Sequence, residues 1–428
     1  MTVASSAGAA TPAQATLAPV WRRLLRARLT GQSAIYTITS VLVMLLGAVG
    51  KAILARKLTP TSFGTYAFAV SFLAYAAMFF EFGLYTPAAR RIAHAEGAER
   101  SEFIGASLAA FVPIGALFCV AVFALSFAVK PVFGVNAGAA LRVISPLAFA
   151  YAFSGPASQL AQGADEVGNY SITGLIGQTA FIVMLVVASI ASAITVSMAL
   201  LINTAGVLIA FLLLAEVLRP RFAAVRDRAR LLVADAREWG LQLYLGRVLS
   251  IGTYNMDVLM VAAFAPAKAV GFYVLAGAFA QASGLPITGL GNALFKSLAR
   301  SKRLDPRWVA LGWAFGAVGV LGVVILTPVV IHVVFTRAYD PVIGLALPLA
   351  LAQAVRGVTG IYNTFLSSHG RGRELRNCGL VLTGSNLVLN FGLIPPFGAI
   401  GAAWASLGAL LANYAAHVYW YRKTGRAR

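Results

Sequence analysis

The amino-acid sequence predicts an all-α integral membrane protein, with twelve transmembrane helices arranged as two homologous six-helix lobes. Composition is the first reason: 59% of the 428 residues are hydrophobic and only 11% are charged, whereas a typical soluble domain has roughly 25% charged residues. The second reason is the recurrence of long apolar segments, and the third is an internal repeat. The alternation of polar and apolar residues that a membrane β-barrel requires is absent from the sequence.

Apolar segments of about 20 residues, the length at which a helix crosses roughly 30 Å of hydrocarbon, occur along the whole sequence. The widest polar gap, residues 219–239, divides them into two groups of six. The expected spans are residues 32–56, 63–88, 103–129, 139–161, 169–190, 194–218, 238–263, 269–294, 308–333, 341–366, 375–395 and 398–421. The expected domains are a disordered cytoplasmic tail (1–28), a first lobe (29–218), a basic cytoplasmic linker (219–236), a second lobe (237–421) and a basic cytoplasmic tail (422–428).

The formal net charge of +20 is distributed unevenly between these segments. With the N-terminus in the cytoplasm, 25 Lys and Arg residues lie in the inward-facing loops and ends, and five lie in the outward-facing loops. Such an imbalance is typical of a multi-pass membrane protein with both termini in the cytoplasm. The charge therefore indicates topology and attraction to anionic membrane lipids, and we expect no nucleic-acid partner.

Short motifs of the first half recur in the second half. Gly-Thr-Tyr at 64–66 and Gly-Phe-Tyr at 271–273 lie 207 residues apart, and each begins an apolar helix that ends in basic residues. Pro146 and Pro348 correspond in a second match, at an offset of 202 residues. Because each half has six helices, the two repeats have the same orientation in the membrane, as in transporters with parallel halves.

Ionisable and polar side chains recur on single faces of three expected helices. An ionisable group within a membrane helix is costly unless it faces protein or water, so each is a candidate functional residue. Faces of this kind are typical of helices that line a water-filled cavity. The residues are Lys51 in the first span, Arg247, Tyr254 and Asp257 in the seventh, and Gln353, Arg356 and Asn363 in the tenth.

Arg247 and Arg356 lie roughly 15–20 Å from the ends of their expected helices, at 1.5 Å per residue. Arginine stays protonated at that depth, and its planar guanidinium group matches phosphate oxygens. We therefore expect a cavity that binds an anionic head group. In the alternative interpretation, the two arginines pair with Glu81 or Asp257 and hold the lobes together.

Lys51 and Glu81 lie nearer the ends of their expected helices, and each has a simpler interpretation. The lysine could extend to the membrane interface, and the glutamate could pair with Arg90 or Arg91. Charge pairing and a role in cation coupling both stay open for Glu81.

The first half contains LARKLTPTSFGTYAFAV (54–70) and EFGLYTPAARR (81–91), and the second half contains DVLMVAAFAPAKAVGFYVLAGAF (257–279) and PPFGAIGAAWASL (395–407). These stretches resemble signatures of bacterial polysaccharide-transport flippases, which belong to the multidrug/oligosaccharidyl-lipid/polysaccharide exporter superfamily. The resemblance covers residues 30–421 and implies two lobes in a V around a central cavity that opens alternately to each side of the membrane.

The resemblance also implies a function. Such flippases move undecaprenyl-pyrophosphate-linked oligosaccharide from the inner to the outer leaflet of the bacterial inner membrane, for O-antigen, capsule or exopolysaccharide biosynthesis. Arg247 and Arg356 would contact the pyrophosphate, with a polysaccharide polymerase or another assembly protein as a possible partner. Further residues of the cavity would be Lys51, Tyr254, Gln353 and Asn363.

Some relatives bind sodium among the seventh, eleventh and twelfth helices. The candidate ligands here are Asp257, Asn386 and Asn390, although the two asparagines could instead form hydrogen bonds between helices. With a single carboxylate in the group, coupling to H⁺ or Na⁺ and no coupling all stay open. We expect no cofactor and assign no metal site.

Three other functions deserve comparison. A membrane glycosyltransferase or polymerase should carry an acidic metal-binding pair or a large external loop, and the sequence has no Asp-x-Asp motif, so we expect no enzymatic activity. A cation-coupled multidrug exporter of the same superfamily would have a site lined by carboxylates. A non-transporting scaffold of polysaccharide assembly would have no need of buried cations.

Overall fold

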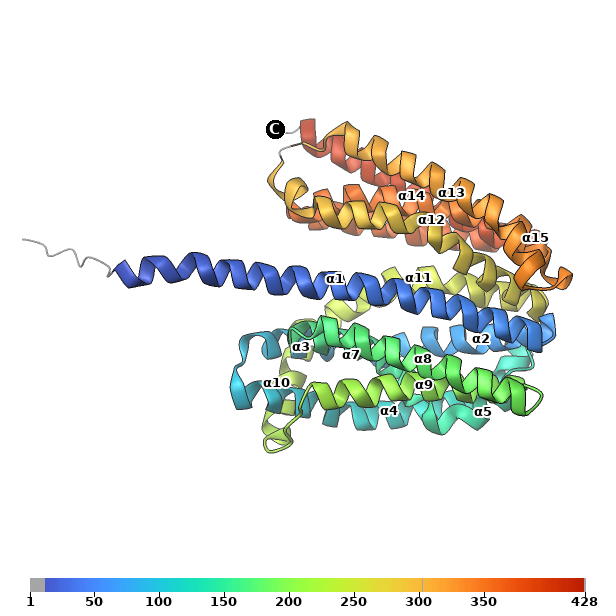
Figure 1. Cartoon of the computed structure of the whole chain (residues 1–428), viewed down its shortest axis with the longest axis horizontal. Helices are drawn as coiled ribbons and strands as arrows, with labels where there is room; N and C mark the ends of the chain where they lie inside the picture. Colours follow the sequence, from blue (N-terminus) through green and yellow to red (C-terminus); the bar gives the residue numbers. More distant parts are fainter. Residues whose placement is uncertain (1–11, 302, 427–428) are drawn as a thin grey trace, which may run out of the picture.

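The structure is a computed structural model that describes the backbone of residues 12–301 and 303–426. The described side chains lie between residues 35 and 423, with the exception of 246–247, 249–255, 289, 292–293, 295–297, 299–300 and 302. The helices of the described chain form two bundles, which are the two lobes, and α1 lies between them in projection (Figure 1).

The elements follow the expected order of two lobes joined by a linker. The first lobe comprises α1 (Pro12–Lys57), α2 (Pro60–Ala77), η1 (Met78–Phe80), α3 (Tyr85–His94), α4 (Gly97–Phe133), α5 (Gly138–Ile144), η2 (Ser145–Leu147), α6 (Phe149–Ala152), α7 (Ser154–Gly163), α8 (Val167–Ala191) and α9 (Val196–Val217). The linker contains α10 (Val225–Asp235) and η3 (Ala236–Gly240). The second lobe comprises α11 (Leu241–Phe264), α12 (Ala267–Arg300), α13 (Pro306–Val334), η4 (Arg337–Tyr339), α14 (Pro341–Ser368) and α15 (Gly372–Arg426).

Within the described residues, nine helices are long and apolar enough to cross a membrane. Helix α15 contains two of the twelve expected spans, because the chain bends at Gly398, where φ is 57°. The span expected at 139–161 is divided into α5, η2, α6 and α7, and the span expected at 238–263 corresponds to η3 and α11. All twelve expected spans therefore lie largely on helical residues.

Two expectations about helix ends differ from the structure. The span expected at 63–88 is interrupted, since Phe82 and Gly83 adopt left-handed φ angles of 48° and 71° between η1 and α3. The backbone of Gly240 lies against this turn, 2.7 Å from where a Cβ of Gly83 would be. Residues 12–28, expected to be disordered, continue α1 as a helix; residues 21–29 (WRRLLRARL) are mostly good helix formers.

The two lobes meet at the end of the molecule opposite the chain termini, which we name the closed end (Figure 1). Here the first turn of α2 packs against the first turn of α12. A Cβ on Gly64 would overlap the carbonyl oxygen of Ala267, and a Cβ on Gly271 would lie 3.1 Å from the Cα of Gly64. Glycine allows this approach because it has no side chain to keep the backbones apart.

Polar and aromatic contacts add to the closed end. The guanidinium group of Arg56, in the last turn of α1, donates hydrogen bonds to the carbonyl oxygens of Val334 and Val333, the latter at 2.8 Å. A cation at the C-terminus of a helix is favourable, because the last carbonyl groups lack partners within the helix. The buried ring of Tyr339 contacts Phe63 and Phe272, with ring centroids 5.8 Å apart in each pair. The first and second lobes therefore share one packed surface here.

The linker is fixed to the first lobe at the opposite end. Asp235 of α10 accepts two hydrogen bonds from Arg91 of α3, at 2.5 and 2.7 Å, and the bonds to Asp235 raise the pKa of Arg91. Arg228 of α10 binds Glu99 and Glu102 of α4 at 2.9 and 3.0 Å. The start of the second lobe is thereby held close to the first lobe.

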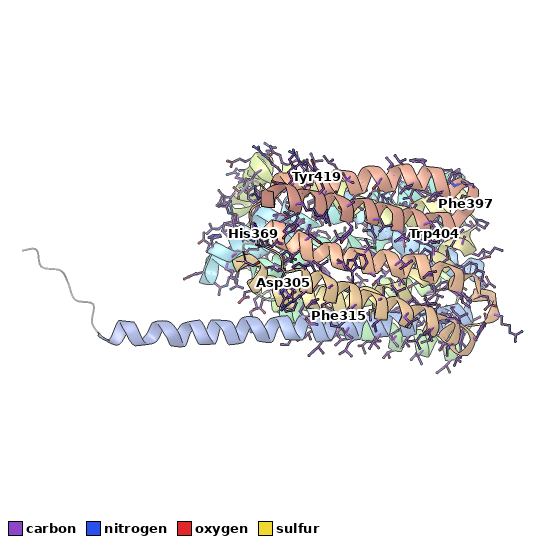
Figure 2. The ribbon with its side chains drawn as sticks, turned by 90° about the horizontal axis from the view of Figure 1, so that it is seen from above. Asp305, Phe315, His369, Phe397, Trp404 and Tyr419 are labelled. Atoms are coloured by element: carbon purple, nitrogen blue, oxygen red, sulfur yellow. The ribbon has the colours of Figure 1, made fainter. Side chains whose placement is uncertain are left out.

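The outer face of the second lobe carries large apolar side chains. Figure 2 shows Phe315, Phe397, Trp404 and Tyr419 on this face, and their exposed fractions are 37%, 60%, 48% and 56%. Exposed aromatic groups on apolar helices fit a surface that contacts lipid.

Candidate functional site

A cavity of about 780 Å³ lies between the two lobes. Helices α1, α2, α8 and α9 of the first lobe line it, together with α12 and α13 of the second lobe. Phe63 and Phe279, which belong to the aromatic contacts of the closed end, are part of its wall. The cavity therefore ends at the packed surface between the lobes.

The wall of this central cavity is mostly apolar, with one cation. Among the lining residues that the structure describes, Lys51 of α1 is the one charged side chain, and no carboxylate is present. An ammonium group in an apolar cavity favours binding of an anion, because a counter-ion offsets the cost of removing the cation from water. The uncharged polar residues of the wall are Ser40, Tyr66, Ser71, Gln178, Asn203, Gln281 and Thr327.

A second cavity of about 370 Å³ lies between α12 and α14, within the second lobe. Gln353 and Arg356 of α14 line it, and Gln281 lines both this cavity and the central one. The two cavities therefore adjoin at Gln281. Lys51 lines the central cavity and Arg356 lines the adjoining one.

The remaining residues predicted for the substrate cavity are placed differently. The side chains of Arg247 and Tyr254 lie outside the described residues. The amide nitrogen of Asn363 lies 3.3 Å from Nε2 of His417 in α15, and Asn363 is not among the lining residues of either cavity. Its contact with α15 fits a structural role between two helices.

Three of the four residues predicted for cation coupling or charge pairing, Asp257, Asn386 and Asn390, lie together between α11 and α15. Asp257 is 5% exposed and accepts a hydrogen bond of 2.6 Å from the side-chain amide of Asn390, which also donates to Asn386 at 3.0 Å. The hydroxyl groups of Ser406 and Tyr273 donate to the other carboxylate oxygen, at 2.5 and 3.1 Å. Three donors thus surround one buried carboxylate.

One acceptor of this cluster has no partner among the described residues: the side-chain oxygen of Asn390 is buried without a hydrogen bond. An unsatisfied buried oxygen beside a carboxylate offers oxygen donors of the kind that hard cations prefer. No group of three His, Cys, Asp or Glu that could hold a metal ion occurs within the described part of the chain. Asp257 is therefore the one carboxylate that the described residues place in this cluster.

Glu81 lies at the turn between η1 and α3, and its carboxylate contacts α7. Gln159 donates a hydrogen bond of 3.1 Å to Glu81, and Thr86 donates one of 2.6 Å to Gln159. The other carboxylate oxygen occupies the space that a Cβ of Gly155 would fill. Arg91, one suggested partner of Glu81, binds Asp235 instead.

We expect Gly155→Ala to lower the apparent melting temperature of the purified protein, since the added methyl group displaces Glu81 from Gln159. Loss of a hydrogen bond to a charged group costs roughly 1.5–3 kcal/mol, whereas Gly→Ala within an unobstructed helix stabilises by roughly 0.5–1 kcal/mol. In a Glu81→Ala background, the same substitution should raise the melting temperature. Equal effects in both backgrounds would show that the carboxylate does not fill this space.

Several residues of these clusters were not predicted from the sequence. Tyr273 and Ser406 complete the hydrogen bonds of Asp257, although Tyr273 belongs to the repeated Gly-x-Tyr motif. Gln159 binds Glu81, and Gln281 joins the two cavities. Each of them is a polar side chain in an apolar span, which is the signal that could have identified it. Uncharged polar residues are common in such spans, so this signal is weaker than that of a charged residue.

Two helical lobes around a central cavity that carries a cation define a class by architecture: helical membrane proteins with two lobes. The family is shown by sequence, since the profile of the polysaccharide biosynthesis protein family matches residues 30–300. The chain belongs to this family. A comparison with curated proteins finds no match.

Solved structures with a similar fold include a lipid flippase and multidrug transporters. The chain is similar to the lipid II flippase MurJ in an inward closed conformation, with 13% identity, coverage of 91% of this chain and 87% of that one, and a TM-score of 0.73. An inward-facing multidrug resistance MATE family transporter of the MOP superfamily has 15% identity, coverage of 90% and 95%, and a TM-score of 0.72. An outward-facing transporter of that kind has 14% identity, coverage of 94% and 96%, and a TM-score of 0.63. Family and fold together define a multi-pass membrane protein of the polysaccharide biosynthesis protein family, with the fold of the MurJ flippase and MATE transporter structures.

Proposed function

We propose that the protein moves undecaprenyl-pyrophosphate-linked oligosaccharide from the inner to the outer leaflet of a bacterial inner membrane, by alternating access, for the biosynthesis of O-antigen, capsule or exopolysaccharide. The observation that carries the proposal is the central cavity, where Lys51 is the one charged group among the described lining residues. Membership of the polysaccharide biosynthesis family supports it, as does the likeness to a lipid II flippase.

The charge of the cavity favours an anionic substrate over a cationic drug. A cationic drug would require a carboxylate in the wall, because burial of an unpaired charge is costly. Lys51 and Arg356 instead provide donors for phosphate oxygens, and Gln178, Asn203 and Gln281 provide hydrogen-bonding groups for sugar hydroxyls. A scaffold that does not transport would not require a cavity between the lobes.

The proposed cycle starts from the conformation described here, with the closed end toward the outer leaflet and both chain termini in the cytoplasm. The pyrophosphate and sugars enter the space between the lobes while the lipid tail stays in the bilayer. The contacts of Gly64 and Arg56 then break, and the lobes rock so that the cavity opens outward. Binding favours this change only where the substrate has different affinities for the two states.

The test is mass spectrometry of lipid extracts from the native bacterium after depletion of this protein. We expect one undecaprenyl-pyrophosphate oligosaccharide to accumulate while one surface polysaccharide is lost, and re-expression of the protein should reverse both changes. An unchanged pool of lipid-linked oligosaccharide, with increased sensitivity to cationic drugs, would favour the multidrug exporter instead.

For coupling, the proposal assigns one monovalent cation, Na⁺ or H⁺, to Asp257. Asp257→Asn should preserve the fold, because the amide of Asn390 can rotate and present its unsatisfied oxygen to the new donor. We expect dependence of transport on a Na⁺ or pH gradient to be lost, a change of roughly 5- to 150-fold for a typical coupling free energy. Transport into proteoliposomes, with and without each gradient, measures this.

Ser406→Ala is the matched control for Asp257→Asn, because it removes one hydrogen bond of the cluster and keeps the charge. It should retain the gradient dependence. If the Asp257→Asn protein responds to both gradients as the parent does, the cluster serves packing alone.

A further inference from the structure

A separate apolar groove lies on the first lobe, away from the central cavity. Its volume is about 700 Å³, and it is lined by α4, by residues of η2 and α6, and by α9 together with the turn that follows it. The described lining side chains are apolar, with the Cys119 thiol the most polar among them. Val112 and Phe222 of this wall are 68% and 60% exposed, so the groove opens to the surroundings of the protein.

The groove has the depth of one leaflet. Its residues on α4 run from Leu108 to Cys119, which is about 17 Å at 1.5 Å per residue, and one leaflet contributes half of roughly 30 Å of hydrocarbon. On α9 it is lined by Phe211 and Ala215, near the end that leads to the linker. The groove therefore belongs to the leaflet on the side of the linker and the chain termini.

A cationic turn closes the groove at that end. Pro220 and Phe222 line the groove, and they alternate with Arg219 and Arg221, whose side chains are exposed. The backbone N–H of Arg221 donates a 2.9 Å hydrogen bond to the carbonyl oxygen of Ser101. A Cβ on Gly105 would overlap the carbonyl oxygen of Arg221, so the turn is packed directly on α4.

Nearby carboxylates do not cancel this charge. Glu99 and Glu102, at the start of α4, both bind Arg228 of the linker. Glu216, in the last turn of α9, is exposed and contributes one negative charge. The turn with its two arginines is therefore net positive at the edge of an apolar groove.

We propose that this groove binds one anionic diacyl phospholipid of the leaflet on the linker side, with an acyl chain in the groove and the phosphate on Arg219 and Arg221. The apolar wall matches an acyl chain, and guanidinium groups bind phosphate oxygens through paired, charge-assisted hydrogen bonds. The bound lipid contacts both α4 and the first residues of the linker. This site does not depend on the function proposed for the central cavity.

The test is native mass spectrometry of the full-length protein, reconstituted in an equimolar mixture of phosphatidylglycerol and phosphatidylcholine and then released. The parent protein should retain one phosphatidylglycerol in preference to phosphatidylcholine. Arg219→Gln with Arg221→Gln should reduce this retention roughly tenfold, as expected for loss of charge-assisted contacts. The matched control, Arg303→Gln with Arg307→Gln, removes the same charge from exposed residues of the second lobe and should retain the lipid.

A second pair of variants tests the groove without changing its charge. Ala116→Trp fills the groove from an exposed lining position, and Leu117→Trp places the same side chain at a neighbouring exposed position outside the lining. Only Ala116→Trp should lose the phosphatidylglycerol. Equal retention of both phospholipids by the parent, undiminished retention in Ala116→Trp, or retention of a co-purified polyprenyl lipid in place of phosphatidylglycerol would each overturn the proposal.

Discussion

Replacement of Gly64 by valine should reduce transport roughly 5- to 150-fold while the protein still inserts into the membrane. In the conformation described here, the space for a Cβ at Gly64 is occupied by the carbonyl oxygen of Ala267. A backbone group cannot move aside as a flexible side chain can, so the valine separates α2 from α12. Overpacking costs roughly 1–3 kcal/mol, which shifts an equilibrium between two conformations by roughly 5- to 150-fold.

In the Gly64→Val protein, we expect the two lobes to be separated at the closed end. The separation can be measured with a cysteine introduced at Thr327, in the cavity wall, in a protein without its native cysteines. The rate at which this cysteine reacts with a thiol reagent is compared between the two sides of the membrane. The variant should react faster from the side of the closed end than the parent does. Gly344→Val is the control, because a Cβ at Gly344 meets no atom within 4 Å; transport by Gly64→Val at the parent rate would contradict the assignment of this contact as a gate.

Lys51→Gln should have the largest effect among single changes within the central cavity. It keeps a side chain of similar length and removes the one charge among the described lining residues. A hydrogen bond to a charged group contributes roughly 1.5–3 kcal/mol, so binding of a pyrophosphate lipid should weaken roughly 10- to 150-fold. Transport of a fluorescent pyrophosphate-linked lipid in proteoliposomes measures this effect.

Two control variants test whether the effect of Lys51→Gln comes from loss of the charge at this position. Lys51→Arg keeps the charge and should retain most of the transport, although the different shape of its head group changes the geometry. Lys130→Gln, at an exposed position near the end of α4, removes an equal charge outside the cavity and should leave transport unchanged. If Lys51→Gln transports the anionic lipid as well as the parent does, the cation of the cavity has no role in recognition.

The positions and order of the apolar helical segments could be predicted from segment length, because each span must cross the same thickness of hydrocarbon. Breaks within helices were harder to predict. The turn at Phe82 and Gly83 depends on the backbone of Gly240, which is distant in the sequence, and no local pattern records that contact. The span expected at 139–161 contains Pro146 and is divided in the structure, but proline alone does not distinguish a kink from a break.

For the site, charged side chains in apolar spans indicated candidate residues, but the sequence did not indicate which residues they contact. Asp257, Asn386 and Asn390 were grouped in advance, and the structure brings them together; their role in coupling stays a prediction. Asn363 shares a helical face with Arg356, yet its side chain contacts His417 in α15. Helical spacing specifies which residues share a face, but the packing of neighbouring helices decides what that face meets.

The contact between Gly64 and Gly271 joins equivalent positions of the two repeats. In a symmetric dimer, a contact between a residue and its own counterpart lies on the two-fold axis, and one such residue serves both partners. A single six-helix repeat with this glycine would therefore place it on the axis of a symmetric pair with a second copy of itself. In the two-repeat chain, a side chain at either glycine would meet the backbone of the other lobe.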